Sequence, residues 1–275
     1  MRPTCAEGAL LRCRVFRLPK LGSTEAEYED ASACPGGDES PYEGRTLAVA
    51  DGASESMLAG QWAAMLVDAI AALGGRSLAD STVLAEVITR TAGAWPRVVE
   101  QYRKGREQAG RPLAWYEEPK LELGAHATVL GLSFHPASAQ EPMPSGGGRW
   151  SLAALGDSCV FHTRGGKIIS ADPLDHADDF GVTPHLATTL HPDPELLAQR
   201  IVAREGGSWL PGDVFYLATD AAAHWTLTAG GPPFLPKEME GFFADDGVRF
   251  ADRQRAQGRL RNDDTTIVRC ELVRT

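Results

Sequence analysis

Five short acidic motifs contain the residues of this chain whose types and spacing could perform chemistry. Four of them lie at the edge of an apolar run or just before one, so their carboxylates would sit at strand ends, rigidly held yet facing solvent. Several such carboxylates that converge would form an all-oxygen site for a hard divalent cation. Two such cations close together can activate water against a phosphoester. In chain order the motifs are Tyr-Glu-Asp-Ala at 28–31, Val-Ala-Asp-Gly at 49–52, Ala-Leu-Gly-Asp-Ser at 154–158, Pro-Gly-Asp-Val-Phe-Tyr-Leu-Ala-Thr-Asp at 211–220 and Asn-Asp-Asp-Thr-Thr-Ile-Val at 262–268.

Each carboxylate taken alone also has a simple structural interpretation. Asp51 precedes a glycine, which is typical of a turn. Asp220 precedes three alanines, as a helix N-cap residue does. Asp157 in Gly-Asp-Ser fits a hairpin turn, and the others fit solvated surface positions: Glu29, Asp30, Asp263 and Asp264. The chemical interpretation therefore depends on all five motifs meeting in space.

The elements that must position the motifs are short strands and helices. Alternating or continuous apolar residues predict strands at 10–18, 47–50, 127–134, 150–155, 159–163, 201–203, 214–219 and 266–273. The strand at 10–18 is expected at the edge of a sheet. Helical spacing predicts helices at about 55–73 (capped by Ser54 or Ser56), from 80 with a break at Pro96, and at 221–228, 237–243 and 248–257. Loops are expected at 34–45, 105–120 and 135–149, and the acidic run 172–179 is interpreted as a solvated loop that could lie over the site. Helix pairs between strand groups that are joined largely by hairpins favour an antiparallel α+β layered domain.

The order and spacing of the motifs resemble the metal-dependent serine/threonine protein phosphatases of type 2C. The resemblance covers nearly the whole chain, and the segment Leu-Gly-Ala-His-Ala-Thr at 123–128 also looks like a part of that family. It implies one domain over residues 1–275, built as a four-layer α-β-β-α sandwich with two antiparallel sheets flanked by helix pairs. The metal site would lie in a cleft at one end of the sandwich.

The resemblance also implies a role for each position in a two-metal centre. Asp51 would bridge two Mn²⁺ or Mg²⁺ ions, and the backbone carbonyl of Gly52 would bind one of them. Asp220 and Asp263 would bind the first ion, partly through waters. A water that bridges the two ions would hydrolyse phosphoserine or phosphothreonine in a phosphorylated protein substrate, and Asp51 and Asp220 are the residues expected to matter most for catalysis.

Three further acidic residues have weaker implied roles. Asp30 and Glu29 would supply the N-terminal acidic contacts of the site, Asp30 as a metal ligand. Asp157, together with Asp220, matches the pair that holds a third, weaker ion in many members of the family.

The sequence departs from the family pattern where the substrate would be held. Five residues before Asp30, where the family often has a phosphate-binding arginine, this chain has Glu25. Arg17 or Lys20 are alternatives for that contact. The histidine that often follows the first Asp-Gly is also absent, which leaves Glu55 or metal-bound water to protonate the leaving group. The alternative hypothesis is therefore a weak or inactive phosphatase-like regulator that binds metals and a phosphorylated partner; in a third interpretation the acidic turns are coincidental.

Composition limits the remaining classes of function. The formal net charge of −10 argues against a nucleic-acid or anionic-membrane partner. The five cysteines are odd in number and form no CxxC pair, which favours reduced thiols in a cytoplasmic protein. No signal peptide and no membrane-spanning run are expected.

Overall fold

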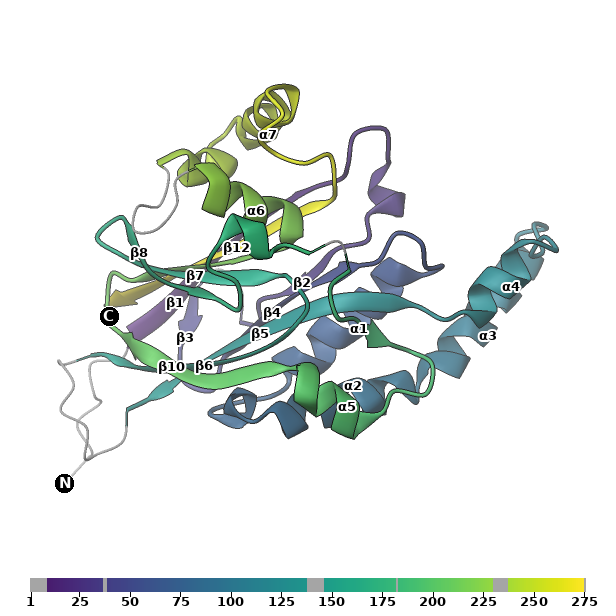
Figure 1. Ribbon diagram of the computed structural model, residues 1–275, viewed down its shortest axis with the longest axis horizontal. Coiled ribbons are helices and arrows are strands. Elements are labelled where there is room, and N and C mark those ends of the chain that lie inside the picture. The colour runs from purple at the N-terminus through teal and green to yellow at the C-terminus, as the bar shows by residue number, and fades with distance from the viewer. Residues whose placement is uncertain (1–8, 37–38, 138–145, 182, 230–236, 275) are drawn as a thin grey trace.

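Two six-stranded antiparallel sheets stack face to face in the computed structural model of the chain (Figure 1). The structure describes residues 9–36, 39–137, 146–181, 183–229 and 237–274. The middle of the predicted 135–149 connection and Cys5 lie outside these residues. The first sheet has the strand order β3-β1-β12-β11-β7-β8, and the second has β10-β6-β5-β4-β2 with β9 paired to β5.

The strands have the following bounds: β1 Ala9–Leu18, β2 Ala31–Ala33, β3 Glu39–Pro41, β4 Thr46–Gly52, β5 His126–Pro136, β6 Gly148–Leu155, β7 Cys159–Arg164, β8 Lys167–Asp172, β9 Ala187–Thr188, β10 Val202–Trp209, β11 Val214–Ala218 and β12 Thr265–Arg274. The α-helices are α1 Ala59–Ala71, α2 Ser81–Ala92, α3 Trp95–Gln108, α4 Glu117–Glu122, α5 Pro194–Arg200, α6 Asp220–Ala229 and α7 Gly247–Ala256. Short 3₁₀ helices cover Glu25–Glu27, Ser77–Ala79, Ala177–Asp179 and Lys237–Phe243.

Helices cover the outer face of each sheet and complete the four layers. Helices α1, α2 and α5 lie against the second sheet, α6 and α7 lie over the first, and α3 with α4 projects from the body (Figure 1). Strand β11 shows why the sequence gives this arrangement. Phe215 and Leu217 belong to the core between the sheets, whereas Tyr216 and Ala218 belong to the core under α6. Because successive side chains of a strand point to opposite faces, a strand covered on both sides is apolar throughout. The α+β sandwich expected from the sequence is confirmed.

One predicted turn, expected to close a hairpin, instead connects the two sheets. The Gly-Asp-Ser turn at 156–158 joins β6 of one sheet to β7 of the other, and the turn at 211–213 joins β10 to β11 in the same way. Turn residues identify a reversal of the chain but do not say which strand pairs with which. Asp157 is therefore not in a hairpin turn. Residues 10–18 form a strand as predicted, but β3 covers Leu10 to Arg12, so that part is not an edge.

Several predicted helix boundaries were also wrong. Helix α1 begins at Ala59, and its cap residue is Leu58 with a left-handed φ of 64° and no side-chain capping bond, so neither Ser54 nor Ser56 caps it. Residues 105–120 are largely helical instead of a loop, since α3 continues to Gln108 and α4 begins at Glu117. The break at Pro96 and the helix start near residue 80 are confirmed, and the structure shows Asp80 as the N-cap residue of α2. Among the helices of the described ranges, none combines the length and the apolar character needed to cross a bilayer.

The acidic run at 172–179 is only partly a solvated loop. Asp172 ends β8, is 5% exposed and pairs with Arg204 on β10. The remaining acidic residues of the run are exposed or half-buried around a short 3₁₀ helix.

Candidate functional site

The five acidic motifs occupy the same end of the sandwich. Antiparallel pairing places the start of one strand beside the end of the next. The last residue of β4, Gly52, pairs with Ala127 near the start of β5, and the last residue of β11, Ala218, pairs with Cys159 at the start of β7 and with Ile267 near the start of β12. The aspartates adjoin these ends, as Asp51 in β4, Asp157 between β6 and β7, Asp220 at the start of α6, Asp263 before β12 and Asp30 before β2.

Asp51 lies at the centre of this acidic group. Burial raises the pKa of Asp51 well above its ordinary value, and the charges of Asp30, Asp220, Asp263 and Asp157 raise it further. Like charges shift the pKa of a carboxyl group only at short range. The structure therefore brings together five aspartates from five separate parts of the chain.

Asp30 is held by two threonines from different strand ends. Its Oδ2 accepts hydrogen bonds of 2.9 Å from the hydroxyls of Thr219 and Thr266. Burial is the main reason that the pKa of Asp30 rises to about 8. Its other oxygen, Oδ1, is buried without a hydrogen-bond partner among the described residues. A buried carboxylate oxygen of this kind is expensive unless a cation or a donor meets it.

Asp220 and Asp157 face a cleft of about 490 Å³ that Asp51 also lines. Burial, followed by the charges of Asp157 and Asp263, raises the pKa of Asp220 to about 6, and burial raises the pKa of Asp157. Four residues that follow the acidic run form one wall of the cleft: Gly181, Thr183, Pro184 and Leu186. The acidic run at 172–179, which the sequence suggested could lie over the site, contributes no residue to the cleft lining; the segment that follows it does.

The second aspartate of the last motif has a positioning role that the sequence did not reveal. Asp264 is 4% exposed and accepts hydrogen bonds from the backbone N–H groups of Lys20, at 2.8 Å, and Glu29, at 2.7 Å. It thereby fastens the segment that carries Asp30 to the start of β12. A sequence interpreted one motif at a time offers no signal for such a contact across the chain.

Gly52 is required by close backbone packing. A Cβ atom on Gly52 would lie 2.7 Å from the carbonyl oxygen of Glu29 and within 3 Å of the Ala59 backbone. The Asp-Gly motif is therefore more than a turn signal, because it lets the N-terminal acidic segment and the start of α1 approach the end of β4.

The donor atoms of this group fit a hard divalent cation in kind. They are carboxylate oxygens, which suit Mg²⁺ or Mn²⁺ and suit soft metals poorly. The unpartnered Oδ1 of Asp30 and the raised pKa of Asp51 both indicate negative charge that lacks a counter-ion among the described residues. In those residues, no three His, Cys, Asp or Glu side chains form a group that could hold a metal ion as they stand. Mutual repulsion of carboxylates opposes such convergence, and waters would have to supply part of any coordination shell.

The two basic residues predicted to contact the phosphate, Arg17 and Lys20, are not among the residues that line the cleft. The Arg17 guanidinium donates to the Oγ and the backbone oxygen of Ser32. Lys20 Nζ contacts Glu29 Oε2 at 3.2 Å and Ser54 Oγ at 2.8 Å, and it lines a neighbouring hollow. Glu25 is exposed in the short helix Glu25–Glu27.

Glu55 does line the cleft, as does a basic residue that the sequence interpretation missed, Arg261. Its Nη1 lies 3.8 Å from Asp220 Oδ2. Its position two residues before Asp263 was visible in the sequence, but the direction of its side chain was not.

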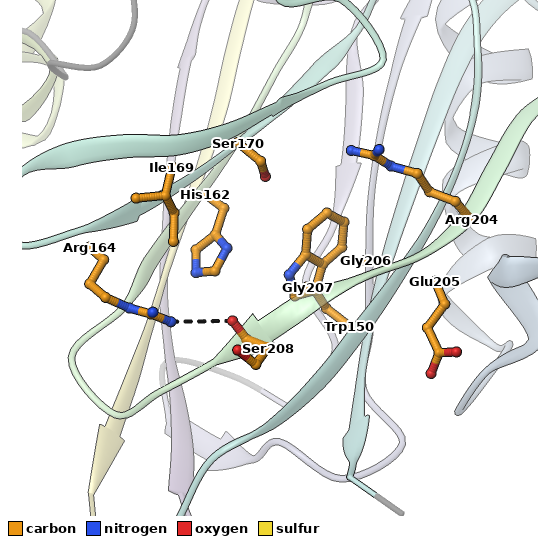
Figure 2. A pocket seen from close by; sticks show the side chains of 10 residues that line it. All are labelled: Trp150, His162, Arg164, Ile169, Ser170, Arg204, Glu205, Gly206, Gly207 and Ser208. Carbon is orange, nitrogen blue, oxygen red and sulfur yellow. Dashed lines mark hydrogen bonds between the residues drawn. The ribbon is translucent and has the colours of Figure 1, made fainter. Parts of the chain in front are cut away.

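A separate pocket of about 300 Å³ lies between the edge strands β8 and β10 (Figure 2). Arg164 and Arg204 lie on either side of the Trp150 ring in this view. Each arginine pairs with a buried aspartate, Arg164 with Asp213 and Arg204 with Asp172. Among the described residues that line it, none belongs to the clustered aspartates, so this pocket is not the site predicted from the motifs.

Comparison with solved structures supports the fold. The structure is similar to the catalytic domain of the serine/threonine protein phosphatase PstP, which was solved with two manganese ions. The match has 19% identity and a TM-score of 0.53, and it covers 96% of this chain and 99% of that one. It matches PppA, a regulatory component of the type VI secretion system of Pseudomonas aeruginosa, at 18% identity and a TM-score of 0.51, over 95% of this chain and 97% of that one. A bacterial serine phosphatase matches at 10% identity and a TM-score of 0.53, over 96% and 99%.

No family model matches the sequence, and a search of curated proteins gave no match either. At these identities the structural likenesses show the fold alone. That fold is the one implied by the resemblance to the type 2C phosphatases.

Proposed function

We propose that this protein is a metal-dependent phosphatase that hydrolyses phosphoserine or phosphothreonine in proteins. The observation that carries the proposal is the gathering of five aspartates from separate segments around Asp51, with burial and mutual repulsion that raise its pKa. The shared fold with a manganese-bound phosphatase domain supports it. We also propose that residues 1–275 act as one domain and that the protein works in the cytoplasm.

The proposed ligands of the two ions are Asp51, the carbonyl of Gly52, Asp30, Asp220 and Asp263. Asp157 would join Asp220 around a third, weaker ion. When bound there, divalent cations lower the pKa of a water and neutralise charge on phosphoryl oxygens. The protein itself fixes the carboxylates: the hydroxyls of threonines 219 and 266 orient Asp30, and Asp264 holds the backbone of Glu29.

Glu55 is the proposed proton donor to the leaving oxygen. It lines the same cleft as Asp51 and Asp220, and no histidine follows the Asp-Gly motif. Loss of general acid catalysis typically lowers the rate by a factor of about 10² or more.

A second hollow supports a polypeptide substrate. It measures about 650 Å³ and adjoins the cleft at Ser54, which lines both. Tyr28, Gln61 and Tyr102 contribute to its walls. A phosphorylated residue in the cleft would leave room there for the neighbouring part of its chain.

The test of the proposal is metal-dependent turnover and its loss on substitution. Purified protein is mixed with p-nitrophenyl phosphate and with a phosphothreonine peptide, in Mn²⁺ and then in a chelator. We expect Mn²⁺-dependent phosphate release that falls at least about 100-fold in Asp51→Asn and in Asp220→Asn, because each removes a charged ligand. Asp68→Asn, at an exposed position on α1, is the control and should retain activity.

The exposed Glu25 favours one alternative, a regulator that binds metals and a phosphorylated partner, because a carboxylate there would repel a phosphate. Manganese binding without turnover on either substrate would establish that alternative. Absence of any divalent-cation binding would contradict both proposals.

A further inference from the structure

A phosphate group that enters the acidic cleft needs a positive contact from the protein. The chain has a formal net charge of −10, and the cleft is lined by Asp51, Asp157, Asp220 and Glu55. Among the described lining residues, Arg261 alone is a lysine or arginine. Building on the proposed function, we propose that Arg261 binds the phosphoryl group of the substrate and takes the part that Glu25 cannot take.

The geometry of Arg261 suits a contact that forms when substrate arrives. Its Nη1 lies 3.8 Å from Asp220 Oδ2, which is beyond hydrogen-bond distance. Its side chain is 45% exposed, against 19% for that of Asp220, so the guanidinium lies at the open side of the carboxylates. A planar guanidinium can donate two parallel hydrogen bonds to a phosphate, which a lysine cannot match.

Three other lysine and arginine side chains near the site are already engaged. Arg255 donates to the carbonyl oxygens of Pro19 and Asp263, so it is part of the scaffold. Lys20 is held by Glu29 and Ser54, and the Arg17 guanidinium donates to Ser32. Each of these would have to give up an existing contact to bind a phosphate.

A purely structural role for Arg261 makes a different prediction. Its positive charge lowers the pKa of Asp157 and of Asp220, so it could serve only to offset charge within the acidic group. In that case its loss would alter the affinity for Mn²⁺. A phosphate contact instead alters the affinity for substrate and for phosphate while the Mn²⁺ affinity changes little, because the Arg261 side chain is 45% exposed and solvent screens its charge from a cation at Asp220.

The experiment compares Arg261→Ala and Arg261→Lys with Arg259→Ala, an exposed arginine that is absent from the cleft lining. We measure kcat and KM on a phosphothreonine peptide, inhibition by inorganic phosphate, and Mn²⁺ affinity by calorimetry. In Arg261→Ala we expect KM and the phosphate inhibition constant to rise about 10- to 100-fold, the range for lost charge-assisted hydrogen bonds. Arg261→Lys should recover part of the loss, and the Mn²⁺ affinity and the Arg259→Ala variant should stay within about threefold of the parent protein.

Two results would overturn the assignment. One is an unchanged KM and phosphate inhibition in Arg261→Ala. The other is a change in Mn²⁺ affinity with no change in phosphate affinity, which would leave Arg261 a role in charge balance alone. If the parent protein hydrolyses neither substrate, the phosphatase proposal fails, but the role of Arg261 can still be tested. Calorimetry then compares the binding of inorganic phosphate to the Mn²⁺-loaded parent protein with its binding to the Arg261→Ala variant.

Discussion

At the scale of single residues, Asp30 shows most directly what the site needs. One of its oxygens is held by two threonine hydroxyls, and the other is buried with no hydrogen-bond partner among the described residues. A surface charge would explain neither fact. Burial of this carboxylate carries a desolvation cost, which a cation bound as proposed would offset.

This environment predicts a pH dependence of stability in metal-free protein. The pKa of Asp30 is raised from its ordinary 3.8 to about 8, so the folded state keeps a proton that the unfolded chain releases. The contribution of Asp30 to the free energy of unfolding is therefore complete below about pH 4 and is lost as pH rises towards 8. Over that range the free energy of unfolding falls by up to about 1.4 kcal/mol per pH unit. Asp220 adds to the loss up to about pH 6.

The measurement is urea unfolding of chelator-treated protein between pH 5 and 8. Asp30→Asn, which keeps an acceptor oxygen for the two threonines, should show a shallower decline, and saturating Mn²⁺ should remove most of the decline in the parent protein. Parallel curves for parent and Asp30→Asn would contradict the assignment of the slope to this carboxylate.

At the scale of elements, the site depends on contacts between segments that are far apart in sequence. The segment that carries Asp30 is fastened to β12 through Asp264, and Gly52 allows that segment to approach β4. Helix α6 begins at Asp220 directly after β11, which fixes this carboxylate at the sheet end. Each aspartate therefore has its own rigid support.

Removal of the Asp264 carboxylate should release the segment of residues 20–29. We expect Asp264→Ala to lower the free energy of unfolding by about 2–4 kcal/mol, since two partly buried N–H groups lose a charged acceptor. Hydrogen exchange of Glu29 should accelerate. Asp263→Asn is the matched control, which should weaken Mn²⁺ binding but leave this exchange unchanged; the reverse pattern in the two variants would refute the division of roles.

The elements also show how far sequence reasoning reaches. The strands around Leu217 and Leu130 were predictable because their apolar runs are covered on both faces. The sheet to which each strand belongs was not, because a turn such as that at Asp157 looks the same whether it closes a hairpin or crosses between sheets. The start of α1 was also missed, because Leu58 caps it by backbone conformation and not by a side chain.

At the scale of the whole molecule, the sequence predicted the sandwich and the gathering of the acidic motifs. Some motifs lie at the end of a strand and others before the start of one, and antiparallel pairing brings the end of one strand beside the start of the next. The sequence could not identify Arg261 or exclude Lys20 from the cleft lining, because those outcomes depend on side-chain direction and on existing partners. An acidic molecule can receive a phosphate only where the local charge is reversed, and in the proposed function cations and Arg261 would reverse it.

The measurement that tests the central claim most directly is anomalous diffraction from a crystal grown with Mn²⁺. The account predicts two strong peaks about 3.5–4 Å apart, both within coordination distance of Asp51 oxygens, with Asp220 and Asp263 on one ion. Peaks at other places, or none beside Asp51 at saturating Mn²⁺, would contradict it.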